Sequence, residues 1–190
     1  MSIIRIIGVI VAIIITISYN AFFVVDERQK ALVLQFGQIK AVKENPGLAF
    51  KIPLIQEVVR YDDRILSLDT QPLEVTPLDD RRLVVDAFMR YRITDVVQFR
   101  QAVGTGGTLS AEKRLERILN AALREVLGSV GSNEILSEGR VSLMEQIRDD
   151  AIAEAVSLGI EIVDVRIKRA DLPTQNLAAT FQRMQAERQR

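Results

Sequence analysis

The segment Leu83–Ile93, LVVDAFMRYRI, decides the fold of the larger part of this 190-residue chain. Its apolar and charged side chains alternate, and successive side chains of a β-strand point to opposite faces of a sheet. The pattern therefore predicts a strand with one face in a core and the other in water. The core face is expected to hold Leu83, Val85, Ala87, Met89, Tyr91 and Ile93, and the opposite face Asp86, Arg90 and Arg92.

Two amphipathic helices are predicted after this strand. The first is expected between Ser110, as the N-cap, and Gly128, just past its end. The second covers about residues 138–158 and stops at Gly159. Apolar residues recur three or four positions apart in both, as Leu115, Ile118, Leu119, Ala122 and Val126 in the first and as Val141, Met144, Ile147, Ala151, Ala155 and Leu158 in the second.

A further strand is predicted at residues 160–168, with Val163, Val165 and Ile167 facing the core. A strand, two helices and a strand in this order indicate one sheet that the two helices cover. Residues 83–172 are therefore interpreted as an α/β subdomain.

The segment before this subdomain carries strand signals. Residues 31–36 are apolar and β-prone, and a second short strand is predicted at residues 48–52. Pro46-Gly47 marks a turn between them. Residues 26–82 are therefore interpreted as a small β-rich subdomain, and the fold class as mixed, α+β or α/β.

The N-terminal residues 6–25, IIGVIVAIIITISYNAFFVV, contain no charge. A helix rising about 1.5 Å per residue over this run spans about the 30 Å of a bilayer's hydrocarbon, which predicts a transmembrane anchor within residues 1–25. The alternative is a cleaved signal peptide, because residues 6–17 alone have the length of its apolar region. The apolar run resumes after Asn20, which favours an uncleaved anchor. The anchor residues are Ile6, Ile7, Val9, Ile10, Val11, Ile13, Ile14, Ile15, Ile17, Phe22, Phe23, Val24 and Val25.

The charges that flank this segment do not predict its orientation in the membrane. Arg5 precedes it, and Arg28, Lys30, Lys40 and Lys43 follow it. Positive residues therefore lie on both sides, and their count favours neither side as cytoplasmic.

The last residues, 173–190, are predicted to begin a coiled-coil helix, with Leu177, Phe181 and Met184 as its apolar contacts. The segment ends in QAERQR without a Gly or Pro stop signal. The alternative is a terminal helix that frays.

Composition excludes most catalytic classes. The chain has no Cys and no His, which removes thiol nucleophiles, imidazole bases and the usual zinc ligands. Its 25 basic and 25 acidic residues balance, so no nucleic-acid surface is predicted. Only carboxylate, Lys, Tyr or hydroxyl chemistry remains.

Two motifs invite a ligand-binding interpretation, and each has a simpler one. The run Gly104-Thr105-Gly106-Gly107 lacks the Gly-Lys-Ser/Thr of a phosphate loop and is interpreted as a connector. The acid pairs Asp62-Asp63, Asp79-Asp80 and Asp149-Asp150 are interpreted as solvated surface residues rather than as metal ligands. We therefore expect no catalytic residue, no cofactor and no metal.

Four ordered motifs resemble the SPFH family, which includes stomatin, prohibitin, flotillin and the bacterial HflK and HflC proteins. They are VVDERQKALVLQFGQI at 24–39, PGLAFKIPLI at 46–55, VDAFMRYRITD at 85–95 and LGIEIVDVRIKRADLP at 158–173. The stretches AVGTGG at 102–107 and RMQAER at 183–188 resemble the HflC-type members most.

The resemblance implies a single-pass protein of the bacterial inner membrane, with its N-terminus in the cytoplasm and its soluble domain in the periplasm. It implies an HflK-like sibling subunit and a homo- or hetero-oligomeric ring or cage that encloses and modulates the membrane protease FtsH. HflC-type proteins also continue into a longer coiled coil. Two rival hypotheses are a stomatin-like membrane scaffold without a protease partner and a membrane-tethered hydrolase that uses carboxylates.

Membrane lipid is the remaining expected partner. Beyond the anchor, the residues expected nearest to lipid are Phe50, Ile52, Leu54 and Ile55, which follow Pro46-Gly47. The alternative for these four residues is a place in a buried β-core.

Overall fold

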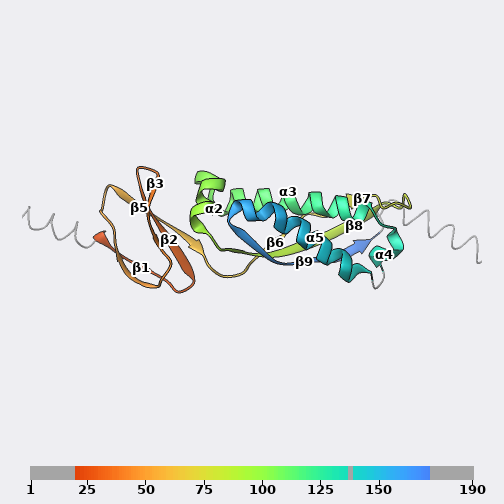
Figure 1. Ribbon diagram of the computed structural model, residues 1–190, viewed down its shortest axis with the longest axis horizontal. Coiled ribbons are helices and arrows are strands. Elements are labelled where there is room, and N and C mark those ends of the chain that lie inside the picture. The colour runs from red at the N-terminus through yellow and green to blue at the C-terminus, as the bar shows by residue number, and fades with distance from the viewer. Residues whose placement is uncertain (1–19, 137–138, 172–190) are drawn as a thin grey trace, which may run out of the picture.

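The computed structural model describes residues 20–136 and 139–171, which form an elongated rod (Figure 1). Strands β1 to β5 build one end of the rod, and β6 to β9 with the helices build the rest. The predicted anchor residues from Ile6 to Ile17, and the predicted coiled-coil residues Leu177, Phe181 and Met184, lie outside the described residues. Both assignments stay predictions.

Two small antiparallel sheets form the β-rich end. β1 (Phe22–Val25) pairs with β4 (Gly47–Phe50). β2 (Gln29–Gln35) lies between β3 (Gln38–Lys43) and β5 (Gln56–Asp62). The two sheets share a small core built from Phe23, Val25, Ala31 and Val33. The prediction of a β-rich N-terminal part is confirmed. The strands β3 and β5 were not predicted from the sequence.

The predicted anchor helix does not continue to Val25. Phe22, Phe23, Val24 and Val25 form the strand β1, in which Phe23 and Val25 are buried while Phe22 and Val24 are exposed. Aromatic and β-branched residues favour a strand, and pairing with β4 satisfies their backbone groups. Including these four residues in the anchor was wrong. Within the described residues, no helix has both the length and the apolar character needed to cross a bilayer.

β8 (Leu83–Ile93) is the central strand of the second sheet. β6 (Leu66–Asp69) and β7 (Leu73–Val75) pair with one of its edges, and β9 (Ile160–Asp171) pairs with the other. All six residues predicted for the core face of β8 are buried. β6 and β7 belong to this sheet, whereas the predicted boundary after residue 82 assigns them to the β-rich subdomain. Alternation of apolar and polar residues indicates a strand but does not show which strand pairs with it. The pairing of β6 and β7 with β8 therefore could not be read from the sequence.

Helices cover one face of this sheet, as predicted from the order of the elements. α3 (Gly107–Gly128) and α5 (Arg140–Ala155) lie along β8 and β9, and α2 (Val96–Val103) precedes α3 (Figure 1). The short elements η1 (Gly104–Gly106), α4 (Ser132–Leu136) and η2 (Val156–Leu158) connect them. We call β6 to β9 with these helices the α/β body.

The start of α3 differs from the prediction. The helix begins at Gly107, so Ser110 lies inside it and is not its N-cap. The Gly-rich run forms a single turn, η1, that leads directly into the helix. Gly104 and Gly107 both have positive φ values, which glycine adopts without strain.

Two residues assigned to the core are exposed. Val141 points outward in α5, and Leu143 is buried instead. In β9, Ile162 is opposite Tyr91 and Asp164 is opposite Arg90, so Val163 is an extra residue in a β-bulge. A bulge reverses the alternation of faces. It turns Val163 outward and returns Val165 and Ile167 to the core.

One core connects the β-rich end with the α/β body. Leu32 and Leu34 of β2 belong to the same cluster of buried side chains as Phe99 of α2 and the core face of β8. Lys30 adds a polar connection, because its Nζ lies 2.8 Å from Asp63 Oδ1 and donates to the carbonyl of Thr94 at 3.3 Å. The rod is therefore packed along its whole described length.

Candidate membrane-facing surface

Exposed apolar side chains concentrate at the β-rich end. The described residues expose fourteen large apolar side chains, and eight of them lie between residues 22 and 55. Contiguous apolar patches on a soluble surface mark sites of contact with protein or lipid. We call these eight residues the apolar surface, and they are Phe22, Val24, Phe36, Leu48, Phe50, Ile52, Leu54 and Ile55.

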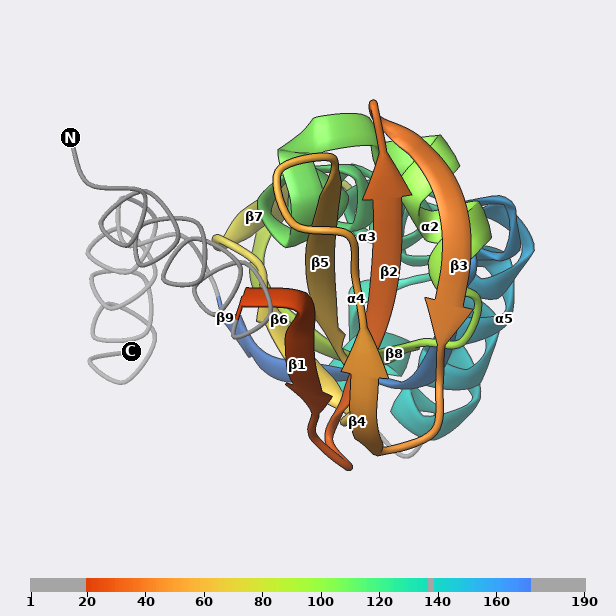
Figure 2. The same cartoon turned by 90° about the vertical axis from the view of Figure 1, so that its left-hand side faces the viewer.

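Strand register brings two loops of this surface to the same end of the three-stranded sheet. Gln35 is opposite Gln38 in β3 and opposite Gln56 in β5. The β2–β3 turn with Phe36 therefore lies beside the 51–55 loop that carries Leu54. Figure 2 looks at the molecule from this side and shows β1 to β5 in front of the helices.

Four residues of the apolar surface, Phe22, Val24, Leu48 and Phe50, lie on the outer face of the β1–β4 pair. Phe22 is opposite Phe50, and their rings meet edge to face with centroids 5.8 Å apart. Val24 is opposite Leu48 in the same ladder. The Lys51 amide donates to the Ala21 carbonyl at 2.8 Å, which ties the start of β1 to the 51–55 loop. Four apolar side chains thus cover a strand pair next to the two loops.

Leu54 is the most exposed of the eight, at 98% of its accessible area. Its φ of 70° is in the left-handed region, which costs a residue with a Cβ about 1–2 kcal/mol. Gln56 holds the loop in place, because its side-chain oxygen accepts from the Ile52 amide at 2.8 Å and its own amide donates to the Ile52 carbonyl at 2.9 Å. The fold therefore holds a large apolar side chain outward in a strained conformation, as functional sites often do.

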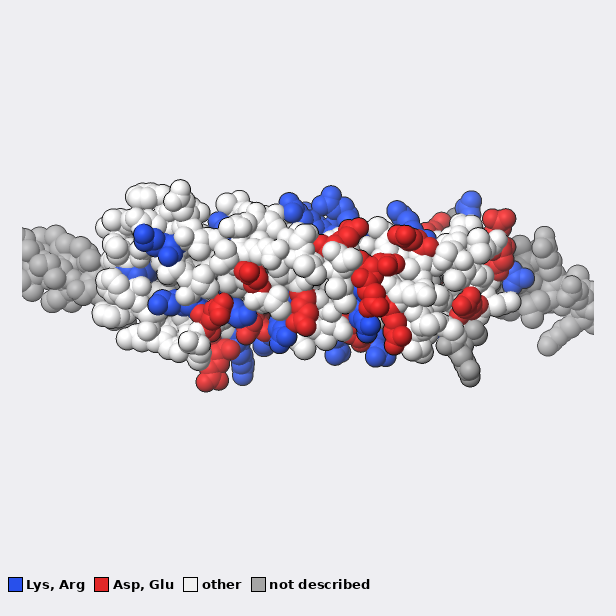
Figure 3. Space-filling model, viewed as in Figure 1, with Lys and Arg blue, Asp and Glu red and all other residues white. Residues whose placement is uncertain are grey.

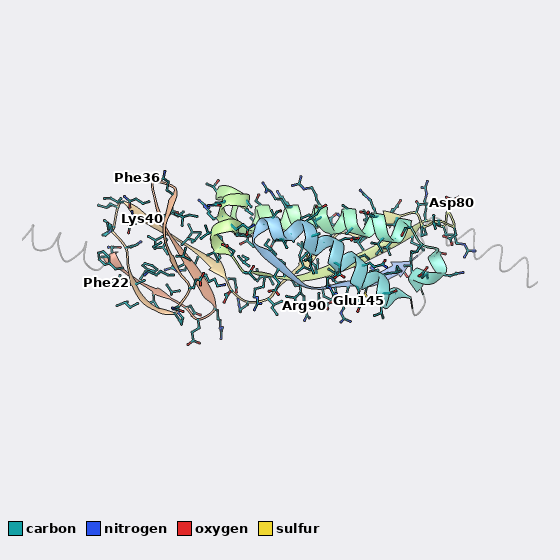
Figure 4. The ribbon with its side chains drawn as sticks, in the orientation of Figure 1. Phe22, Phe36, Lys40, Asp80, Arg90 and Glu145 are labelled. Carbon is teal, nitrogen blue, oxygen red and sulfur yellow. The ribbon has the colours of Figure 1, made fainter. Side chains whose placement is uncertain are left out.

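Positive charge predominates between Gln29 and Gln56. Between Gln29 and Gln56 the sequence has four lysines, and its one acidic residue is Glu44 in the turn at the far end of β3. On the face that Figure 3 shows, this end of the rod is white and blue, while red and blue alternate along the α/β body. Figure 4 places Phe22, Phe36 and Lys40 together at this end.

The four residues predicted to lie nearest to lipid are all part of this surface. Phe50, Ile52, Leu54 and Ile55 are exposed, which excludes the alternative of a buried β-core for them. Phe36 and Leu48 were not predicted from the sequence to lie near lipid, and Phe22 and Val24 were assigned to the anchor. A signal existed in the Phe36-Gly37 turn, because an aromatic residue at a hairpin turn is exposed unless another element covers it.

Three acids of the pairs found in the sequence, Asp62, Asp63 and Asp79, have hydrogen-bond or ion-pair partners. The bidentate hydrogen bond from Arg64 lowers the pKa of Asp62, and its neighbour Asp63 pairs with Lys30. The Ser132 hydroxyl donates to Asp79 and lowers its pKa. In the described ranges, 20–136 and 139–171, no three acidic residues gather in a group that could hold a metal ion.

The opposite end of the rod carries the end of the described chain. β9 runs away from the apolar surface and ends at Asp171 (Figure 1). Asp80, in the β7–β8 loop, lies at this end, and Arg90 and Glu145 lie between the two ends (Figure 4). The apolar surface and the start of the C-terminal segment are therefore separated by the length of the α/β body.

Comparisons with known proteins agree with this architecture. The family model "SPFH domain / Band 7 family" matches residues 23–190. The "Modulator of FtsH protease HflC" of Escherichia coli K12 is 31% identical over 225 aligned positions that cover 95% of this chain and 67% of the relative. "Protein HflC" of Haemophilus influenzae is 33% identical, with 94% of this chain and 64% of the relative covered.

A third relative extends the same pattern. "Protein HflC" of Buchnera aphidicola subsp. Acyrthosiphon pisum is 32% identical over 90% of this chain and 61% of its own length. The chain thus spans about two thirds of the length of these relatives. The family match covers the β-rich end, the α/β body and the C-terminal segment, so the chain belongs to the SPFH domain / Band 7 family.

Proposed function

We propose that the chain is a membrane-anchored, non-catalytic scaffold of the HflC type. In this proposal it assembles with an HflK-like sibling subunit into a ring or cage and modulates the FtsH protease. The observation that carries the proposal is the apolar surface at one end of a family domain whose chain continues from the other end. Such a domain can contact a membrane and project its C-terminal segment away from it.

The anchor and the apolar surface act together in this proposal. Because β1 begins at Phe22, the uncharged run that precedes it covers residues 6–21. A helix over these residues would be about 24 Å long, which is shorter than the roughly 30 Å of bilayer hydrocarbon. A short span draws its flanking residues toward the lipid. We infer that the apolar surface enters the interface next to the anchor.

Anchoring also supports assembly. Domains held upright in one membrane plane meet at high effective concentration, so weak side-to-side contacts between α/β bodies suffice to build a ring. Leu177, Phe181 and Met184 would continue these contacts as a coiled coil beyond Asp171. No reaction and no cofactor are required.

The proposed partners and location come from the relatives. The Escherichia coli relative is named a modulator of FtsH protease, which supports FtsH as the partner here. An HflK-like sibling, the bacterial inner membrane, a cytoplasmic N-terminus and a periplasmic domain are proposals that rest on the family resemblance. A stomatin-like scaffold that assembles without a protease is the outcome that would replace this assignment.

Purification of the chain from its native membrane in mild detergent, followed by electron microscopy, tests the proposal. We expect rings that contain a sibling subunit and the protease. Leu54→Ser should reduce their recovery, whereas Leu78→Ser, which changes an exposed leucine outside the apolar surface, should not. Rings without the protease would support the stomatin-like scaffold, and monomers alone would contradict both assignments.

A further inference from the structure

We propose that Lys40 and Lys51 bind the headgroups of anionic phospholipids, so that the apolar surface selects an anionic membrane. This proposal rests on the proposed membrane contact and adds the lipid class to it. Lys51 lies between Phe50 and Ile52, and Lys40 lies in β3 close to the Phe36 turn. Each lysine therefore borders the apolar surface.

The position of Lys40 follows from an irregularity in the β2–β3 ladder. Val33 is opposite Ala41 and Leu34 is opposite Ile39, so Lys40 is an extra residue on β3. A β-bulge of this kind redirects a side chain at the edge of a sheet. Lys40 is exposed, and β3 is an edge strand of its three-stranded sheet. The bulge thus places an ammonium group where a headgroup can reach it.

Neither lysine has a carboxylate partner within residues 20–136 and 139–171. Eight ion pairs occur among the described residues, and none includes Lys40 or Lys51. Basic residues of the α/β body, such as Lys168 with Asp69 and Arg92 with Glu161, have carboxylate partners instead. Glu57, which follows Gln56 at this end, offsets part of the positive charge. Phosphate groups of lipids are the complementary partner that a membrane would supply.

Lysines have the reach that this role requires. Their long apolar stems extend along apolar surface while the charge remains among the headgroups. A basic residue near an anionic leaflet strengthens membrane association about fivefold, and the effect fades within a Debye length. Together the two lysines should therefore favour anionic over zwitterionic lipid by roughly tenfold or more at low salt.

Brominated-lipid quenching tests this selection in the full chain. The sequence contains no Trp, so Leu54→Trp introduces a single fluorophore into the apolar surface. The variant is reconstituted into phosphatidylcholine and phosphatidylglycerol vesicles in which one of the two lipids is brominated. We expect stronger quenching by brominated phosphatidylglycerol, and loss of this preference after Lys40→Gln and Lys51→Gln.

The control variants separate the possible results. Lys113→Gln, an exposed lysine in α3, should leave the preference unchanged, and Glu57→Gln should increase it. Equal quenching by both brominated lipids would overturn the headgroup selection while leaving the membrane contact intact. Absence of quenching by either lipid would instead contradict the membrane contact on which the proposal rests.

Discussion

The rings of Tyr61 in β5 and Phe99 in α2 meet edge to face with their centroids 5.1 Å apart, and this contact joins the β-rich end to the α/β body. The Tyr61 hydroxyl is buried and has no hydrogen-bond partner within the described ranges. A buried polar group without a partner costs about 1–3 kcal/mol. The ring thus stabilises the junction while its hydroxyl weakens it.

Tyr61→Phe should therefore raise the free energy of unfolding by about 1 kcal/mol, because it keeps the ring and removes the unsatisfied oxygen. Urea unfolding in detergent micelles measures the change. Tyr91→Phe is the matched control, since the buried Tyr91 hydroxyl donates to Glu112 Oε1 at 3.4 Å and its loss should lower stability. A decrease for both variants would show that the Tyr61 hydroxyl has a partner.

Gly159 is the glycine at which a side chain should be most harmful. It ends η2 in the left-handed conformation, with φ of 69°, and an added Cβ would lie 2.6 Å from the Asp95 carbonyl oxygen. Gly159→Ala should cost roughly 2–4 kcal/mol, because backbone strain and a backbone clash add. Gly37→Ala, at φ of 80° with no atom near the added Cβ, should cost only about 1 kcal/mol. Equal losses would contradict the packing at Gly159.

Replacing Leu54 should separate stability from membrane contact. Leu54→Gly removes the left-handed strain and should leave the free energy of unfolding equal to, or up to about 1 kcal/mol above, that of the wild type. Leu54→Ala keeps the strain and should bring no such gain. Both variants lose the apolar side chain, so depth-dependent quenching of a Trp introduced by Ile55→Trp should show the 51–55 loop withdrawing from the bilayer in both. An unchanged loop depth would contradict a lipid contact by Leu54.

Ser132 should make part of the stability dependent on pH. Its hydroxyl donates to Asp79 and lowers the pKa of that carboxyl, so the ionised form stabilises the fold. This contribution is present above the unfolded-state pKa of about 3.9 and is lost as the pH falls through the lower folded-state value. The Tm difference between wild type and Ser132→Ala should therefore be largest near neutral pH and shrink in acid. Ser142→Ala, whose hydroxyl donates to the Gly139 carbonyl, should show a difference that does not change with pH.

The regular elements of the α/β body could be predicted from the sequence because their patterns are local. Strict alternation in β8 and the three- and four-residue spacing in α3 each report one buried face. The outward turn of Val163 could not be predicted, since a bulge is defined by the partner strand. The pairing of β6 and β7 with β8 could not be predicted either, because it too depends on the partner strand.

The apolar surface could be predicted only in part. The PGLAFKIPLI motif identified four of its residues, although a buried role for them was equally consistent with the sequence. Phe22 and Val24 followed an uncharged run and looked like its continuation, because hydropathy does not distinguish a helix in lipid from a strand that covers a small core. Their pairing with Leu48 and Phe50 is tertiary information.

Spin labelling of the chain in vesicles gives the sharpest test of membrane contact by the apolar surface. The sequence has no Cys, so Leu54→Cys allows a single nitroxide to be attached at position 54. Leu78→Cys, in the β7–β8 loop beside Asp80, supplies the matched label at the opposite end. We expect the label at position 54 to be accessible to oxygen and shielded from a water-soluble nickel complex, and the label at position 78 to show the reverse. Equal access of the nickel complex to both labels would contradict a membrane contact by the apolar surface.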